Sequence, residues 1–276
     1  MADGAASPAS ELAGAKRIAG AFAAARSEGR AALMPYLMAD YPDHETSLAV
    51  ADAYVDGGAD LVELGIPFSD PLADGPTIHA AATKALRGGA TLDSALEVCR
   101  SIADRVPVVA MGYANMILAR GPSEFAAKLA AAGAVGAIVP DLPPEEGGEV
   151  TDALRDAGLA IVPLVAPNTS PERRARICGG AEGFVYLVSD TRTTGERDEL
   201  ASGLADLVAA TRDVSPVPVA VGFGIGTAEQ AASIGSVAEG AIIGSRLVRA
   251  VAETDSADDA ARSVREFLGE CRSAMG

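Results

Sequence analysis

Short apolar segments recur along the whole chain, and a stretch with the period of an amphipathic helix follows most of them. We find eight such segments, and most are apolar at nearly every position. They cover Leu33–Met38, Asp60–Ile66, Val106–Tyr113, Gly136–Asp141, Ala160–Ala166, Phe184–Ser189, Pro218–Gly224 and Gly240–Ser245. Strands covered on both faces are typical of parallel sheets with helices outside. Eight strand–helix units in succession predict an α/β fold, a closed (β/α)8 TIM barrel. A doubly wound sheet is the weaker alternative, because no Gly-rich dinucleotide fingerprint follows the first segment.

Two predicted helices lie outside this repeat. Residues Ser10–Arg26 are rich in alanine and predict an extra helix before the first strand, placed to cover the barrel floor. A proline-rich loop, Pro67–Pro76, and an inserted helix, Thr77–Arg87, lengthen the connection after the second strand. No linker divides the chain, so we expect one barrel domain over residues 1–276, with residues 1–9 as a disordered tail.

Composition excludes several classes of function. The chain has 38 Asp and Glu against 22 Lys and Arg, and its formal charge of −16 repels nucleic acid and anionic membranes. The longest uncharged apolar-rich run, Leu129–Pro140, is too short to cross a bilayer. Three widely spaced cysteines and two histidines match neither a disulfide framework nor a metal-ligand pattern, so we expect a cytoplasmic protein without a bound metal.

An acidic residue stands inside the second predicted strand. Alternation places Leu61, Glu63 and Gly65 on one face, while the other face is wholly apolar and should meet the helices. Glu63 is therefore expected to point into the barrel, where an unpaired carboxylate is costly unless its pKa rises. Such a group is a candidate general acid and base. The alternative is a structural glutamate paired with a buried cation, although the predicted strands hold no interior Lys or Arg.

The loop after this strand carries two more carboxylates, Asp70 and Asp74. Its three prolines restrict the backbone, so its shape is set in advance. A rigid loop above the barrel mouth can direct a carboxylate to the ligand that Glu63 reaches, and two carboxylates in different settings can serve as acid and base. The alternative is that both aspartates only cap turns or helices.

Glycines at the ends of the last two strands indicate a phosphate site. Strand seven ends in Val221–Gly226 and strand eight in Ile243–Arg246. In barrels, the turns after these strands and the N-terminus of a short helix bind phosphate through backbone amides. Ser245 would add a hydroxyl, and Gly195 after strand six would complete the ring; tight turns alone are the alternative.

Three tyrosines, Tyr36, Tyr113 and Tyr186, fall within or at the ends of predicted strands. Aromatic residues gathered at one barrel mouth can hold a flat ligand between them. Filling of the core is the alternative and the commoner role of a strand aromatic.

The run Glu63–Pro76, of sequence ELGIPFSDPLADGP, resembles the signature of the tryptophan synthase alpha subunit family. Further segments share the resemblance, which extends over nearly the whole chain: Leu33–Tyr36, Gly112–Asn115, Val139–Pro143, Pro163–Asn168, Phe184–Ser189, Val221–Ile225 and Ile243–Ser245. The resemblance implies an (α/β)8 barrel, in agreement with the strand count. It also implies a lyase of tryptophan biosynthesis, which cleaves indole-3-glycerol phosphate to indole and glyceraldehyde 3-phosphate by a retro-aldol reaction.

The resemblance further implies residue roles. Glu63 would be the main acid and base, and Asp74 would accept a hydrogen bond from the indole N–H and stabilise positive charge on the ring. The indole pocket would be lined by Tyr36, Tyr113 and Tyr186, with Thr194 as a loop threonine that meets Asp74 on closure. The phosphate would be held by Gly195, Phe223, Gly224, Gly244 and Ser245.

By the same resemblance the chain would need no cofactor of its own and would join a pyridoxal-phosphate beta subunit in an αββα complex. The loops with Asp70 and with Asp141–Pro143 would face that partner. The sequence departs from the family after strand six, where Asp190 replaces a positive residue and Arg192 replaces a glycine. Two alternatives follow: a weakly active alpha-like subunit that activates a beta partner, and a stand-alone indole-releasing homologue of a specialised pathway.

Overall fold

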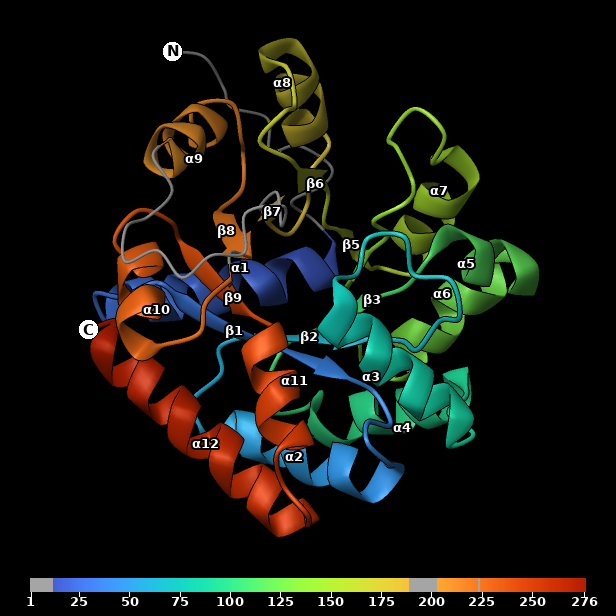
Figure 1. Ribbon diagram of the computed structural model, residues 1–276. Coiled ribbons are helices and arrows are strands. Elements are labelled where there is room, and N and C mark those ends of the chain that lie inside the picture. The colour runs from blue at the N-terminus through green and yellow to red at the C-terminus, as the bar shows by residue number, and fades with distance from the viewer. Residues whose placement is uncertain (1–11, 189–202, 223) are drawn as a thin grey trace.

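The computed structural model describes residues 12–188, 203–222 and 224–276. Within these residues it has a single parallel sheet, with strands in the order β5-β4-β3-β2-β1-β9-β8-β7-β6. The strands are β1 Ala32–Met38, β2 Val62–Gly65, β3 Val108–Met111, β4 Gly136–Ile138, β5 Ala160–Ile161, β6 Leu164–Val165, β7 Val185–Val188, β8 Val219–Gly222 and β9 Gly240–Ile243. The strands lie in the middle of the molecule, with the helices around them (Figure 1).

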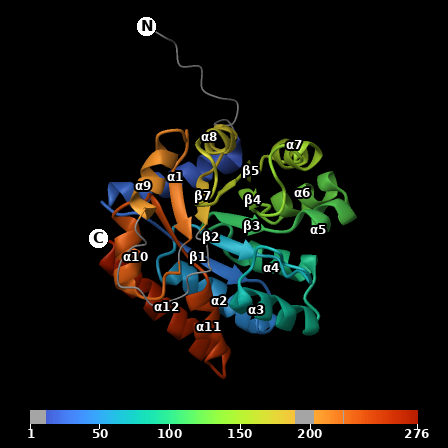
Figure 2. The same cartoon turned by 45° about the horizontal axis from the view of Figure 1, so that its top comes forward.

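The helices of the described residues come before, between and after these strands, singly or in pairs, and none of them separates β5 from β6. They are α1 Ala13–Ser27, α2 His44–Asp56, α3 Pro76–Arg87, α4 Leu92–Ile102, α5 Ala114–Arg120, α6 Pro122–Ala131, α7 Gly148–Asp156, α8 Pro171–Gly179, α9 Leu204–Arg212, α10 Ala228–Gly235, α11 Ser245–Ala252 and α12 Ala257–Ala274. Helices α7, α8 and α9 lie on one side of the strands, and α2, α11 and α12 lie on the other (Figure 2). The (β/α)8 prediction is confirmed, including the inserted helix α3.

The fifth predicted strand differs from expectation, because it forms two short strands instead of one. β5 pairs with β4 and β6 pairs with β7, so the continuous segment 160–165 bridges the two ends of the strand order. Pro163, between the two strands, has no N–H to donate, which divides the ladder there. Its carbonyl still accepts from Tyr186 N at 3.0 Å. The segment 160–165 therefore pairs with β4 before Pro163 and with β7 after it.

The predicted N-terminal helix covers the barrel floor. The backbone N–H of Gly14 donates to the carbonyl of Gly158 at 3.1 Å, and a Cβ on Gly14 would lie 1.8 Å from the carbonyl oxygen of Val135. Ile18 and Phe22 of α1 pack into the apolar cluster that fills the barrel interior. A glycine is thus required where the helix backbone meets the strand ends. The predicted tail at residues 1–9 lies outside the described residues.

Alternation in β2 matches the sequence prediction. Leu61 joins the interior cluster, whereas Val62, Leu64 and Ile66 join the larger cluster between the strands and the helices. The register pairs Glu63 with Tyr36 on one side. The two faces of β2 therefore pack into two different apolar clusters, one inside the barrel and one between the strands and the helices, as a barrel requires.

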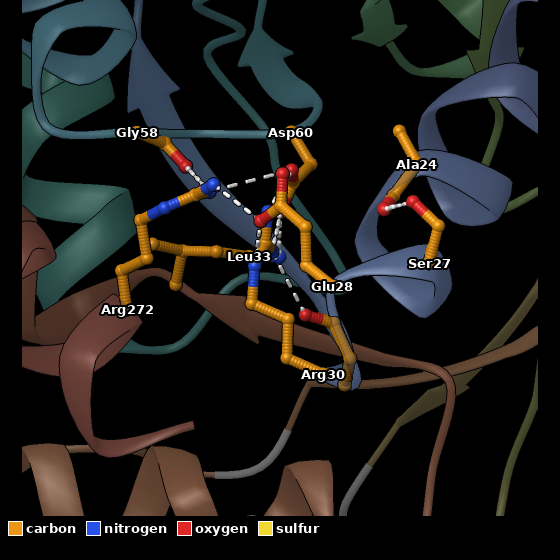
Figure 3. Close-up of polar contacts among 9 residues, drawn as sticks. Ala24, Ser27, Glu28, Arg30, Leu33, Gly58, Asp60 and Arg272 are labelled. Carbon is orange, nitrogen blue, oxygen red and sulfur yellow. Dashed lines mark hydrogen bonds and ion pairs between the residues drawn. The ribbon is translucent and has the colours of Figure 1, made fainter. Parts of the chain in front are cut away.

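Buried charges at the barrel floor are paired. The Arg30 guanidinium binds both carboxylate oxygens of Asp60, which also accepts from Leu33 N at 2.7 Å (Figure 3). Arg272 donates to the carbonyl of Gly58 and to Glu28, which ties α12 to the same corner. The floor is thus closed by a network in which each buried charge has a partner.

The same arrangement occurs twice more at the floor. Glu182, before β7, accepts from Ile161 N and pairs with Arg155. Glu239, before β9, accepts from Val219 N and pairs with Arg212. In each case a carboxylate that precedes one strand accepts a hydrogen bond from a backbone amide of another strand, Leu33 of β1, Ile161 of β5 or Val219 of β8. These carboxylates join strands of the barrel to one another.

Candidate active site

Glu63 lies at the other end of the barrel from these pairs, and in the part of the chain that the structure describes it belongs to no ion pair. The residue is 3% exposed, and among the described residues its Oε2 has no hydrogen-bond partner. Burial, with the nearby Asp74 carboxylate as a second cause, raises the pKa of Glu63 to about 8. The alternative of a structural ion pair is not supported, because no ion pair among the described residues includes Glu63. Near neutral pH this side chain holds a proton that it can donate.

Of the two loop aspartates, Asp74 is the one close enough to act on Glu63. Asp74 is partly buried, and burial raises the pKa of its carboxyl. A hydrogen bond from Tyr113 and the charge of His79 act in the opposite direction. Asp70 is exposed and accepts a hydrogen bond from Ser69 Oγ at 2.5 Å. The loop therefore directs one carboxylate to the mouth and leaves the other at the surface.

The three predicted tyrosines surround this pair of carboxylates. Tyr36 and Tyr113 are 5% and 2% exposed. Burial raises the pKa of Tyr36 and of Tyr186, and in both cases the charges of Glu63 and Asp74 add to the effect. Tyr113 follows β3 and immediately precedes α5, a helix that the sequence pattern did not reveal. The three phenols thus come from β1, from β7 and from the residue before α5, and they converge on one mouth.

Two glycines that sequence reasoning did not single out make room for these rings. A Cβ on Gly65 would lie 2.1 Å from the Tyr36 hydroxyl oxygen, and one on Gly222 would lie 2.5 Å from the Tyr186 hydroxyl oxygen. Each glycine closes its strand, at the C-terminal end of β2 or β8. Their inward position in the alternating pattern is the sequence signal that marks them.

The predicted phosphate site is described in part. Gly244 follows β9, and Ser245 is the first residue of α11. No side chain of the described residues caps the N-terminus of α11, so its first amides stay available to an anion. Gly224 follows β8 with φ of 30° and is exposed. Thr194, Gly195 and Phe223, as well as Asp190 and Arg192, lie outside the described residues.

Together these groups form a mouth with an acid at the bottom, a second carboxylate on a loop, aromatic walls and a helix N-terminus. In the residues that the structure describes, no cluster of three or more His, Cys, Asp or Glu is arranged to hold a metal ion. Among those same residues no helix is both long and apolar enough to cross a membrane. The arrangement suits acid–base chemistry on a flat, anionic ligand.

Comparison with known proteins identifies the family. The sequence model described as tryptophan synthase alpha chain matches residues 22–275. The chain belongs to the tryptophan synthase alpha chain family. The family's members from Roseiflexus castenholzii and Halorhodospira halophila are 46% and 44% identical to it. These alignments cover 91% and 94% of this chain, and 97% and 96% of the relatives.

Solved structures agree with the tryptophan synthase alpha assignment. A structure of Mycobacterium tuberculosis tryptophan synthase superposes with a TM-score of 0.87 at 38% identity. The match covers 94% of this chain and 98% of the other. The resemblance carried by the Glu63–Pro76 run and the barrel prediction are therefore both confirmed.

Proposed function

We propose that the chain is the alpha subunit of a tryptophan synthase and cleaves indole-3-glycerol phosphate to indole and glyceraldehyde 3-phosphate. The observation that carries this proposal is the buried Glu63, whose Oε2 has no partner among the described residues and whose pKa is raised to about 8, beside a second carboxylate on a restrained loop. A retro-aldol cleavage needs a group that is an acid near neutral pH and a base one step later. Family membership supplies the substrate class.

The reaction follows from the two carboxylates. Protonated Glu63 gives its proton to indole C3, which turns the ring into an iminium-like cation. Asp74 accepts a hydrogen bond from the ring N–H and stabilises that charge. The bond between C3 and the glycerol chain then breaks, and its electrons neutralise the ring. The glycerol hydroxyl loses its proton to ionised Glu63 as the aldehyde forms, which restores the starting enzyme. This scheme uses only side chains of the chain, so we propose that it carries no cofactor.

The mouth orients the substrate between its two ends. Tyr36 and Tyr186 would flank the indole ring, and Tyr113 would complete the aromatic wall. Gly244 and Ser245 at the N-terminus of α11 would bind the phosphate with Gly224. By family resemblance Thr194, Gly195 and Phe223 would complete the site. Backbone amides and a helix end bind phosphate without a basic patch, which reconciles the anionic substrate with the acidic chain.

We also propose that the chain joins a beta subunit with pyridoxal phosphate, in an αββα complex. The loop Pro67–Pro76 and helix α5 together line a cavity of about 250 Å³. Each of these two elements also carries an exposed large apolar side chain, Leu72 at 86% and Leu118 at 53%. Exposed apolar groups beside a cavity are typical of an interaction surface. The exposed Asp70 lies on the same loop.

Two further proposals concern the whole chain. Residues 1–276 form one barrel domain, supported by the strand order of the described residues. The protein works in the cytoplasm, supported by three cysteines that are all free and buried.

A steady-state lyase assay with indole-3-glycerol phosphate tests the function, with and without a tryptophan synthase beta subunit. The proposal expects indole release by the chain alone and a faster rate with the partner. No indole in either case would overturn the lyase proposal and favour a non-catalytic, activating subunit. High activity that no beta subunit changes would favour the stand-alone homologue and overturn the proposed complex.

A further inference from the structure

Among the described residues, one side chain, Tyr113, makes the hydrogen bonds that hold the loop with Asp74 to the barrel. The Tyr113 ring stacks on Phe68 with centroids 5.2 Å apart and an angle of 23° between the planes. Its hydroxyl oxygen accepts a hydrogen bond from Ala73 N at 3.3 Å. The Asp74 carboxylate of the next residue lies close enough to the phenol for a hydrogen bond from its O–H to lower the pKa of Asp74. Within the described residues, the hydrogen bonds that tie residues 67–74 to the strand ends all go to this phenol.

Tyr113 is itself fixed from below. It is 2% exposed and stands between β3 and α5. The preceding residue, Gly112, donates its N–H to the carbonyl of Ile138 at 3.0 Å, and the following residue, Ala114, donates to Asp141 Oδ1 at 2.9 Å. The phenol is therefore anchored to β4 and to the loop after it. A residue fixed on the barrel side that contacts the loop at three points can set the position of the loop.

The direction of the hydroxyl proton follows from its partners. A phenol has one proton and accepts through its oxygen lone pairs. Because the oxygen accepts from Ala73 N–H, its proton is left for the carboxylate of the next residue, Asp74. One hydroxyl thus binds the backbone before the aspartate and the aspartate itself. This arrangement fixes both the approach and the orientation of the carboxylate.

We propose that Tyr113 is a positioning residue that holds the Asp74 carboxylate over the barrel mouth in the geometry the reaction needs. This role rests on the proposed function and adds to the aromatic lining expected of Tyr113. Leu72, exposed at 86%, directly precedes the amide that Tyr113 binds. A partner that covers Leu72 therefore contacts the residue next to the one that this phenol holds.

The test compares Tyr113→Phe with Tyr54→Phe in the full chain. Tyr113→Phe keeps the ring and its stack on Phe68 but removes both hydrogen bonds to the loop. Tyr54→Phe is the matched control, because it removes a buried phenol hydrogen bond of 2.9 Å, to the Tyr36 carbonyl, and leaves the loop untouched. The first readout is amide hydrogen exchange at Ala73. The second is the pH profile of kcat and KM for indole-3-glycerol phosphate.

We expect exchange at Ala73 to become at least about 10-fold faster in Tyr113→Phe and to stay unchanged in the control. We expect kcat to fall about 10-fold or more with a smaller change in KM, because the hydrogen bond is needed most when charge builds on the ring. The acid limb of kcat/KM moves to higher pH, because Asp74 loses the donor that opposes the effect of burial on its pKa. The charge of His79 and the nearby Glu63 are unchanged in both variants.

Unchanged exchange at Ala73 in Tyr113→Phe would overturn the claim that Tyr113 holds the loop in place. Faster exchange with unchanged kcat and pH profile would overturn the positioning role. Amide exchange at Ala73 is measured without substrate, so it tests the contact between Tyr113 and the loop independently of catalysis. A chain without lyase activity would refute the proposed function but would leave this exchange measurement valid. Should Tyr113→Phe fail to fold, Phe68→Leu removes the stack instead, and the same faster exchange is expected from it.

Discussion

Glu63 at the mouth has a setting opposite to that of three carboxylates at the floor. At the floor, Asp60, Glu182 and Glu239 each pair with an arginine and accept an amide hydrogen bond from a neighbouring strand. At the mouth, Glu63 has one oxygen without a hydrogen-bond partner among the described residues, and none of the ion pairs there includes it. The floor uses carboxylates to join strands, whereas the mouth keeps a carboxyl whose proton is free to move. The difference separates residues that stabilise the fold from residues proposed to react.

The largest expected effect is on activity at the mouth. Glu63→Gln removes the proton donor and keeps the shape of the side chain, so we expect the lyase rate to fall by a factor of about 10² to 10⁴. The variant is expected to fold normally, because the change removes no ion pair between residues that the structure describes. Steady-state indole release and circular dichroism measure the two effects. A variant that keeps substantial turnover would remove the role given to Glu63.

The second effect is on stability at the floor. Glu182→Gln weakens the hydrogen bonds to Arg155 and to Ile161 N that join β5 and the entry to β7. We expect the free energy of unfolding to fall by about 1–3 kcal/mol, as for hydrogen bonds to a charged group. Urea unfolding measures the change. The rate per folded molecule is expected to stay within about twofold, and a large loss of rate would show that the floor also governs the chemistry.

The sequence alone predicts the residues of the mouth better than those of the floor. Alternation within β2 was enough to place Glu63 inside the barrel, because one strand carries the whole signal. The floor pairs join Arg30 to Asp60 and Arg155 to Glu182, residues 30 and 27 positions apart, and only the strand register brings them together. The same limit applies to Tyr113 and Ala73, 40 positions apart. The division of the fifth predicted strand at Pro163 could not be predicted either, because it depends on which neighbouring strand each half pairs with.

A third effect links pH to stability through Glu63. Its pKa is about 8 in the folded chain against an ordinary value of 4.5, so the folded state holds more protons than the unfolded state between these values. The free energy of unfolding should therefore decrease as pH rises from about 4.5 to about 8. Glu63→Gln should lose this decrease while Glu182→Gln retains it. Unfolding of both variants at pH 5 and pH 8 measures the difference, and equal slopes would contradict the unpaired setting of Glu63.

The smallest effect is expected at a surface ion pair that belongs to neither end. Lys128 Nζ lies 3.0 Å from Asp93 Oδ1, with the Asp93 side chain 72% exposed. Solvent screens such a pair, so Lys128→Ala should change the free energy of unfolding by less than about 1 kcal/mol. Urea unfolding in the same buffer as for Glu182→Gln gives the comparison. A loss as large as that of the floor variant would show that burial is not what distinguishes the floor pairs.

The central claim is that setting, and not residue type, divides these glutamates into reactive and structural ones. Glu63 and Glu182 are both buried, at 3% and 6% exposure, and the same change to glutamine applies to each. The direct measurement is the lyase rate of Glu63→Gln relative to Glu182→Gln, with both rates taken per folded molecule. We predict a ratio of about 10⁻² or lower. A ratio near one would contradict the account.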